Sequence, residues 1–344
     1  MIKVGIIGAT GYVGAELMRI LLNHKKIEIS AISSVSFEGQ EFESIYKNFF
    51  NHTSLVCGSM DEVIAKADVI FTALPHGFSE DIAAKCIDSN KICIDLGADF
   101  RLSNEEDYKF WYERSFSHPK LHKKSVYGLP ELNKEKIKNS RLIANPGCYP
   151  TSIELGLMPL LLNSLIETKG IICDSKSGAT GAGRGLTLSS HFPELNNNFA
   201  PYKVGAHRHT PEIEETLGVM AKEKVSITFT PHLLPINRGI ISTIYCTPKG
   251  NINLEETHKL YESFYLDKPF VNVLPLGEIA CTKNVRFSNH CNISLHLNHR
   301  KDQLIVVSAI DNMVKGAAGQ AIQNMNIILG FDETEGLNFI SPAF

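Results

Sequence analysis

The sequence lacks the features of a membrane-spanning or exported protein. None of its 344 residues lies in an apolar run near the ~20 residues that a membrane span needs, and the apolar start, residues 1–8, is too short for a signal peptide. The eight cysteines include no C-x-x-C pair, and several lie inside apolar runs, which is typical of reduced core thiols. We therefore expect a cytoplasmic protein.

A net positive charge and low-complexity segments are also missing. With 34 basic and 37 acidic residues, the net charge of -3 gives no general attraction to nucleic acid or to anionic membranes. A hydrophobic fraction of 43% with 21% charged residues is instead the balance of a globular enzyme. Because single cores rarely grow beyond roughly 250–300 residues, a chain of 344 residues predicts two domains.

The hydrophobic pattern predicts an α/β chain whose two halves differ. In the first half, short β-branched runs alternate with helical spacing, which predicts a doubly wound parallel sheet of the Rossmann type with ligands at the carboxyl ends of its strands. The strands expected there are residues 3–7, 28–33, 69–72, 92–95 and 142–144, and the helices are residues 13–22 and 77–88.

After about residue 151, longer alternating runs predict an α+β domain with a mostly antiparallel sheet. The strands expected in this half are residues 226–230, 240–246, 291–297 and 304–309. Residues 311–328 then return to helical spacing.

A glycine-rich turn follows the first predicted strand and opens the first predicted helix. Gly8 allows the tight turn, Gly11 allows close approach of a pyrophosphate, and Gly14 lets the helix pack on the strand. The free amides of the helix N-terminus then face the phosphates. The residues predicted to bind a dinucleotide here are Gly8, Thr10, Gly11, Tyr12, Val13 and Gly14. An ordinary strand-to-helix turn is the alternative interpretation.

The end of the second predicted strand favours NADP over NAD. NAD sites usually carry an acidic residue there to hold the ribose 2′-hydroxyl, whereas this strand ends in Ser33 and Ser34. No carboxylate repels a 2′-phosphate, and the two hydroxyls can donate hydrogen bonds to it. Both serines can equally be ordinary strand-end residues.

Cys148 differs from the other seven cysteines in its surroundings. It lies in Asn-Pro-Gly-Cys-Tyr-Pro-Thr, residues 145–151, where a strand ends and a helix is about to begin. A thiol at a helix N-terminus is stabilised as the thiolate, and the same amides can hold the oxyanion of a tetrahedral intermediate. A buried core cysteine after a turn is the alternative.

Two histidines and an arginine lie close together before a later predicted helix. If the segment is extended, His207 and His209 point the same way, and one of them can exchange protons with Cys148. A zinc site is a rival, but no matching ligand set accompanies the two histidines, so we expect no metal. The lone histidines His24, His52 and His122 are expected at the surface.

A second glycine-rich loop, residues 175–184, offers amides, hydroxyls and Arg184 to a phosphate or to the nicotinamide end of a cofactor. A flexible surface loop is the alternative. Arg101 and Arg238 are further candidates for binding an anion.

These motifs together resemble the N-acetyl-gamma-glutamyl-phosphate reductase family of arginine biosynthesis. The resemblance is more distant to aspartate-semialdehyde dehydrogenases and to phosphorylating glyceraldehyde-3-phosphate dehydrogenases, which lack the strings around Cys148 and His207. It spans nearly the whole chain in order and rests on residues 8–14, 73–77, 96–101, 127–131, 145–151, 175–184, 207–213 and 312–324.

The resemblance implies an NADP-binding Rossmann domain of residues 1–147 with 313–344, and a catalytic and oligomerisation domain of residues 148–312. It implies a homo-oligomer, either tetramer or dimer, with Cys148 as nucleophile and a histidine as acid and base, for which His209 is favoured over His207. Ser177, Gly178 and Asn312 would contact the nicotinamide end of the cofactor. The substrate would be held by Arg101, Ser177, Arg184, His207, Arg208 and Arg238.

The implied reaction is the NADPH-dependent reduction of N-acetyl-glutamyl 5-phosphate to N-acetyl-glutamate 5-semialdehyde and phosphate, through a thioester on Cys148. The same chemistry on aspartyl or N-acetyl-aminoadipyl phosphate is the nearest alternative. A non-catalytic NADP-binding protein that has kept the fold is an alternative from another class.

Overall fold

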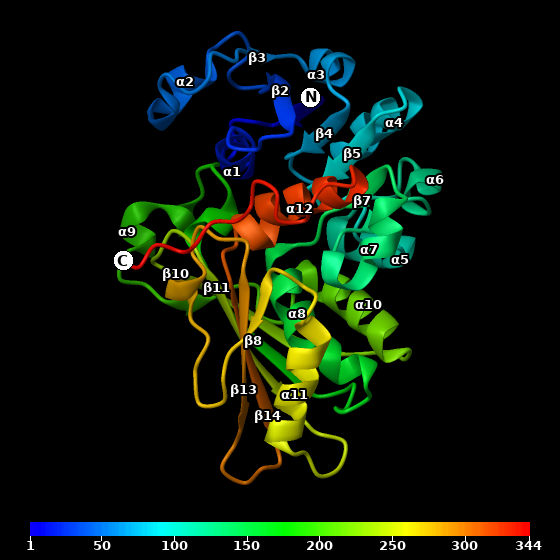
Figure 1. The fold of residues 1–344 in the computed structure, drawn as a ribbon, viewed down its shortest axis with the longest axis vertical. Coiled ribbons are helices and arrows are strands. Elements are labelled where there is room, and N and C mark those ends of the chain that lie inside the picture. The colour runs from blue at the N-terminus through cyan, green and yellow to red at the C-terminus, as the bar shows by residue number, and fades with distance from the viewer. The chain divides into compact units, whose positions relative to one another are not determined.

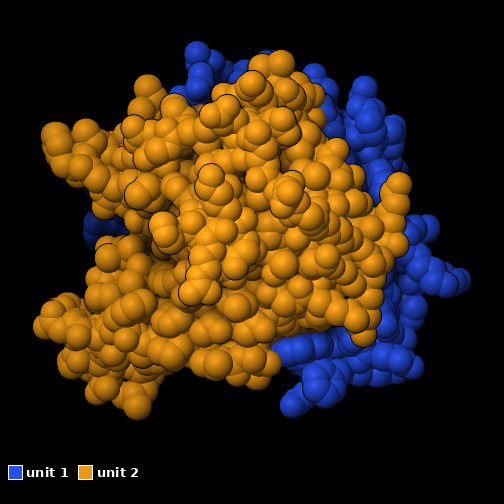
Figure 2. All heavy atoms as spheres, turned by 90° about the horizontal axis from the view of Figure 1, so that it is seen from below, with its two compact units in different colours: residues 1–146, 317–338 blue, residues 147–316, 339–344 orange.

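The computed structural model describes residues 1–344 and divides the chain into two compact units. Unit 1 is Met1–Pro146 with Ala317–Asn338, and unit 2 is Gly147–Gly316 with Phe339–Phe344 (Figure 2). Each unit contains a sheet of seven strands (Figure 1). No helix combines the length and the apolar character that crossing a membrane requires.

The sheet of unit 1 is parallel throughout, in the order β3-β2-β1-β4-β5-β7-β6. Its strand order reverses beside β1, and the glycine turn leaves the carboxyl end of that strand, where doubly wound sheets bind ligands. The predicted Rossmann-type sheet is therefore confirmed. The strands are β1 (Ile2–Ile7), β2 (Ile27–Ser33), β3 (Cys57–Gly58), β4 (Val69–Thr72), β5 (Ile92–Asp95), β6 (Val126–Tyr127) and β7 (Leu142–Ala144).

The last helix of the chain belongs to this first unit, where it packs against α7, α1 and β5. The polar side chains that it buries are hydrogen-bonded: the Asn324 amide donates to the Gly128 carbonyl at 2.8 Å, and His24 bonds to Asn326 at 3.0 Å. The helices of unit 1 are α1 (Tyr12–Leu21), α2 (Phe42–Ile45), α3 (Met60–Lys66), α4 (Ser79–Asp88), α5 (Glu105–Tyr112), α6 (Pro119–His122), α7 (Pro130–Lys138) and α12 (Gly319–Ile328).

One expectation about unit 1 was wrong. His24 and His122 were expected at the surface but are buried, 5% and 7% exposed. His24 bonds to Asn326 of α12. His122 stacks on Phe116, and its Nε2 lies 3.3 Å from the Glu80 carboxylate. Residues 311–328, which were expected to have helical spacing, are helical from Val314 onwards, with a π-helical turn at Val314–Ala318 before α12.

The sheet of unit 2 is mixed, in the order β12-β13-β14-β11-β8-β10-β9. The pairs β8–β10 and β12–β13 are parallel and the other four pairs are antiparallel, which confirms a mostly antiparallel sheet. The strands are β8 (Ile171–Gly178), β9 (Ala200–Pro201), β10 (Ile227–Leu234), β11 (Ile240–Cys246), β12 (Val271–Val273), β13 (Cys291–Leu297) and β14 (Leu304–Ile310). The helices are α8 (Cys148–Leu162), α9 (Phe192–Leu195), α10 (His209–Ala221) and α11 (Leu254–Tyr265).

Helix α8 is the buried centre of unit 2 and packs on β11, β14, α10 and α11 (Figure 1). It is mostly apolar and is buried continuously from Tyr149 to Leu161. Pro159 lies inside it and has no amide hydrogen to donate to the Leu155 carbonyl. The Tyr265 hydroxyl donates to that carbonyl instead, and the Tyr261 hydroxyl donates to the Gly156 carbonyl at 2.6 Å. The central helix therefore tolerates its proline.

Asp95, at the carboxyl end of β5, is fully buried. Its Oδ1 accepts hydrogen bonds from the Thr72 hydroxyl at 2.6 Å and the Gly97 amide at 3.0 Å. Burial, with a smaller effect from the charge of Asp99, raises the pKa of Asp95 from 3.8 to about 6.

We expect Asp95→Asn to change how stability depends on pH. Because the folded protein keeps the Asp95 proton to a higher pH than the unfolded chain, the free energy of unfolding falls between about pH 4 and about pH 6, by about 3 kcal/mol in full. The asparagine variant cannot ionise and keeps the acceptor for Thr72 and Gly97, so it should lack this fall. Thermal unfolding from pH 4 to 8, with the exposed Asp88→Asn as matched control, measures the difference. Parallel curves for Asp95→Asn and the wild type would contradict the expectation.

Candidate active site

Cys148 is the first residue of α8, and Gly147 caps that helix in an extended conformation. It is half-buried, whereas six of the other cysteines are buried, and no disulfide joins any of the eight. The first amides of a helix have no partner within the helix, and they carry the positive end of its dipole. The predicted position of Cys148 at a helix N-terminus is thus what the structure shows, and it favours the thiolate.

Glu212, in the first turn of α10, fixes the start of α8. Its Oε1 accepts a hydrogen bond of 2.7 Å from the Gly147 amide, and the residue is 1% exposed. The sequence pattern does not single out Glu212, although it lies one turn after His209 in the same motif. The N-termini of two helices are therefore joined beside the thiol.

The two motif histidines are close together, but not by the expected geometry. The segment is not extended, because Arg208 is helical and His209 begins α10. The two imidazoles nevertheless lie 4.8 Å apart between centroids, and both lie within 6.0 Å of the ring of Tyr149, which follows Cys148 directly. The structure therefore groups both histidines with the residue next to the thiol.

His207 is held in one tautomer. Its Nδ1 accepts a hydrogen bond of 3.1 Å from the His209 amide, which leaves Nε2 as the ring nitrogen that carries hydrogen. Burial, and then the neighbouring charges of His209, Lys203 and Arg208, lowers the pKa of His207 to about 2. The His207 ring is therefore a neutral hydrogen-bond donor at physiological pH.

Two tyrosines that the sequence did not single out line the same place. The Tyr202 hydroxyl donates to the Tyr149 hydroxyl at 3.1 Å, and the Tyr149 hydroxyl donates to the His232 carbonyl at 3.4 Å. Burial is the main cause that raises the pKa of Tyr202 to about 12, and nearby Cys148 adds to it. Burial likewise raises the pKa of Tyr149 well above its ordinary value. Both hydroxyls therefore stay protonated.

Ser177, Gly178 and Asn312, which were expected at the nicotinamide end of a cofactor, lie close together. Gly178 donates to the Gly239 carbonyl at 2.9 Å, and the Gly239 amide donates to Asn312 Oδ1 at 2.8 Å. The Asn312 amide donates to the Thr180 hydroxyl at 3.0 Å. Asn312 therefore ties the loop after β8 to the loop before β11.

The predicted anion-binding arginines are placed differently from one another. Arg184 is exposed, and Arg208 is half-buried at the start of α10. Arg238 lies 3.7 Å from the Asp311 carboxylate and over the Phe287 ring. Arg101, in unit 1, donates through Nε to the Asn145 carbonyl and through Nη2 to the Leu96 carbonyl, both at 2.9 Å. Two of the guanidinium nitrogens of Arg101 thus already donate to main-chain carbonyls.

The glycine turn of unit 1 is tightly packed at two of its glycines. Gly8 has a φ of +84°, and a Cβ there would overlap the Ala73 carbonyl oxygen. A Cβ on Gly14 would overlap the Gly8 carbonyl oxygen. Gly11 caps α1, with Tyr12 exposed and Val13 half-buried just behind it. Only glycine therefore fits at the two tight positions.

The predicted 2′-phosphate site is built on the same turn. The carbonyl of Ser33 accepts from the Gly8 and Ala9 amides, while its hydroxyl is buried without a hydrogen-bond partner in the protein. The hydroxyls of Thr10 and Ser34 bond to each other at 2.6 Å. No cluster of three histidine, cysteine or carboxylate side chains arranged for a metal ion occurs in the chain.

Two protein-family models match most of the chain. The model described as semialdehyde dehydrogenase, NAD binding domain, matches residues 3–140. The model described as semialdehyde dehydrogenase, dimerisation domain, matches residues 148–312.

Full-length relatives are closely similar. An N-acetyl-gamma-glutamyl-phosphate reductase of Clostridium botulinum (strain Alaska E43 / Type E3) is 75% identical over 100% of both chains. Those of Brachyspira hyodysenteriae and Desulforudis audaxviator are 55% and 48% identical, the first over 100% of both chains and the second over 98% of this chain and 99% of its own.

Solved structures share the fold at low sequence identity. Aspartate semialdehyde dehydrogenase II complexed with ASA from Vibrio cholerae has a TM-score of 0.74 at 15% identity, covering 96% of this chain and 98% of its own. The Candida albicans aspartate semialdehyde dehydrogenase with NADP has a TM-score of 0.73 at 16% identity, with the same coverage. At these identities the likeness concerns the fold alone.

We expect Glu212→Ala to destabilise the protein and slow alkylation of Cys148. It leaves the buried Gly147 amide without an acceptor, which costs about 1–3 kcal/mol, and it releases the start of α8. Glu212→Gln keeps an acceptor for the Gly147 amide, so it should lose less stability and slow alkylation less than Glu212→Ala. Iodoacetamide kinetics and thermal unfolding measure the two effects.

Glu214→Ala is the matched control for this pair of variants, because Glu214 on the same helix accepts from the Ile227 amide at 2.9 Å. It should lose stability without slowing alkylation. If Glu212→Ala and Glu214→Ala slow alkylation equally, the Gly147 contact has no special effect on the thiol.

Proposed function

The chain belongs to the N-acetyl-gamma-glutamyl-phosphate reductase family, and we propose that Cys148 is the nucleophile with which it attacks its acyl phosphate. It is an NADP-dependent oxidoreductase that reduces N-acetyl-glutamyl 5-phosphate to N-acetyl-glutamate 5-semialdehyde and phosphate, in arginine biosynthesis. The similarity to aspartate semialdehyde dehydrogenases is confined to the fold, so the alternative of aspartyl phosphate has no comparable support.

The assignment of Cys148 as the nucleophile is supported by its position in the first turn of α8, where the neighbouring Tyr149 contacts His207 and His209. The thiolate attacks the acyl carbon, and the carbon–oxygen bond to phosphate breaks once the carbon–sulfur bond has formed, leaving a thioester. Main-chain amides of the first turn donate to the oxyanion of this step. When the carbonyl re-forms after reduction, the carbon–sulfur bond breaks and the thiolate is restored.

Proton transfer is assigned to His209. His207 stays neutral, and its Nδ1 is occupied by the His209 amide, so we assign it a hydrogen bond from Nε2 to the substrate. His209 takes the thiol proton, gives it to the oxyanion that forms when the thioester is reduced, and takes it back from the hydroxyl as the thiohemiacetal collapses.

The glycine turn fits a dinucleotide, because its tight positions admit only glycine and the buried Ser33 hydroxyl has no protein partner. Bound NADPH supplies the hydride that reduces the thioester carbon. We assign the 2′-phosphate to Ser33 and Ser34, and the nicotinamide end to Ser177, Gly178 and Asn312. The residues assigned to the pyrophosphate are Gly8, Thr10, Gly11, Tyr12, Val13 and Gly14.

The negatively charged ends of the substrate are assigned to guanidinium groups, which bind carboxylate and phosphate bidentately. The residues proposed for substrate binding are Arg101, Ser177, Arg184, His207, Arg208 and Arg238. We assign NADP binding to residues 1–147 with 313–344, and catalysis to residues 148–312.

Residues 148–312 match a dimerisation domain, and we propose a homo-oligomer, either dimer or tetramer. As an enzyme of amino-acid biosynthesis, it is proposed to act in the cytoplasm. We expect no nucleic acid or membrane as a partner.

Cys148→Ser should lower kcat by at least about a thousandfold and leave NADPH affinity unchanged, because an unactivated hydroxyl is a poor nucleophile at neutral pH. The assay runs the reverse reaction with N-acetyl-glutamate 5-semialdehyde, phosphate and NADP, and fluorescence titration measures cofactor binding. Cys281→Ser, at the other half-buried cysteine, is the matched control. Unchanged turnover in Cys148→Ser would remove Cys148 from the mechanism.

The two histidine variants should differ in their pH profiles. His207→Asn should lower kcat/KM without moving the midpoints between pH 5 and 9, because a pKa of about 2 keeps His207 neutral across that range. His209→Asn should lower kcat and remove one limb of the profile. Steady-state kinetics across this pH range measure both. A shifted midpoint in His207→Asn with a normal profile in His209→Asn would reverse the assignment.

A further inference from the structure

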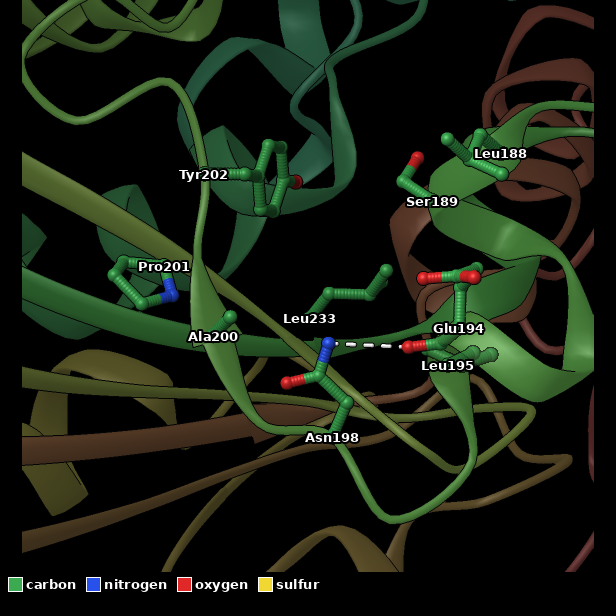
Figure 3. Close-up of a pocket in the computed structure, with 9 residues that line it drawn as sticks. All are labelled: Leu188, Ser189, Glu194, Leu195, Asn198, Ala200, Pro201, Tyr202 and Leu233. Carbon is green, nitrogen blue, oxygen red and sulfur yellow. Dashed lines mark hydrogen bonds between the residues drawn. The ribbon is translucent and has the colours of Figure 1, made fainter.

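A pocket of about 500 Å³ opens in unit 2 beside Tyr202. Figure 3 shows Ala200, Pro201 and Tyr202 along one side of it, with residues of the segment around α9 on the opposite side. Leu233 of β10 lies between them and pairs with Ala200. The lining residues are Leu188, Ser189, Glu194, Leu195, Asn198, Ala200, Pro201, Tyr202 and Leu233.

Tyr202 connects this pocket to the thiol site. Its ring contributes to the pocket wall and lies 5.6 Å from the His207 ring, between centroids. Its hydroxyl donates to Tyr149, the residue next to Cys148. When the acyl carbon of a substrate lies at the Cys148 sulfur, the other end of that substrate can therefore reach the pocket.

Charge decides which part of the substrate suits the pocket. No lysine or arginine lines it, and Glu194 is its one charged residue. The phosphate and the α-carboxylate are anions, which Glu194 would repel, whereas the N-acyl amide is neutral. The leucine, alanine and proline side chains suit an acyl chain, and Ser189 and Asn198 suit the polar atoms of its amide.

We propose that this pocket is the N-acyl subsite of the enzyme and that it accepts acyl groups longer than acetyl. This inference rests on the proposed function. The size of the pocket supports the acceptance of longer acyl groups. About 500 Å³ is in the range of sites for whole small molecules, whereas an acetyl group has only three non-hydrogen atoms and would leave most of that space unfilled.

The test is the reverse reaction on a series of N-acyl-glutamate 5-semialdehydes, from acetyl through propionyl and butyryl to benzoyl, with phosphate and NADP. The wild type should keep kcat/KM for the butyryl substrate within about tenfold of that for the acetyl substrate. Ala200→Phe, which fills the pocket, should lower kcat/KM for butyryl at least about tenfold more than for acetyl, chiefly through KM. Leu195→Ala enlarges the pocket and should favour the benzoyl substrate.

Leu186→Phe is the matched control, since Leu186 is almost fully exposed and does not line the pocket. It should retain wild-type selectivity. Activity on the acetyl substrate shows that each variant is folded.

Three outcomes would overturn the proposal. A wild type that rejects the longer acyl groups would exclude the broad subsite. Equal losses of kcat/KM for all acyl lengths in Ala200→Phe would exclude the pocket as the N-acyl subsite. Wild type inactive on every member of the series would overturn the proposed function, and this inference with it.

Discussion

The hydrogen bond from the Gly147 amide to the buried carboxylate of Glu212 is the contact on which the thiol site depends. A carboxylate that is 1% exposed is tolerated only when polar groups surround it, and the free amides at a helix start supply them. The bond joins the first turn of α10, where His209 lies, to the residue before Cys148. Nucleophile and imidazoles are thus positioned by one contact between two helix ends.

The stiffness of α8 makes that contact effective. The helix is buried along nearly its whole length, and hydroxyls from Tyr261 and Tyr265 bond its carbonyls around Pro159. On another side of the thiol, a Cβ on Gly316 would lie only 2.8 Å from the Cys148 Cβ. The π-helical turn that contains Gly316 therefore packs closely against the start of α8, and a side chain at this position would push the nucleophile away.

Sequence patterns were sufficient wherever the determining interactions are local. Strands β4, β5, β7, β11 and β13 begin and end at the expected residues, because apolar runs and the turns that bound them are visible in the chain itself. Glu212 and Tyr202 were not found, since their roles come from contacts 65 and 53 residues away in sequence. His122 was misplaced for the same reason: its burial depends on stacking against Phe116 and on Glu80 of another helix.

The Tyr149 and Tyr202 hydroxyls and the His207 ring are neutral hydrogen-bond donors beside the thiol. Burial keeps the hydroxyls of Tyr149 and Tyr202 protonated and the ring of His207 uncharged, because removing a charge from water is costly. The Tyr202 hydroxyl donates to Tyr149 and the Tyr149 hydroxyl donates to the His232 carbonyl, so His207 Nε2 is the donor assigned to the substrate, and it needs no rearrangement when negative charge develops there. Arg184, by contrast, is exposed to water. Neutral donors thus lie beside the thiol, whereas Arg184, one of the groups proposed for the substrate's anionic ends, keeps its charge in water.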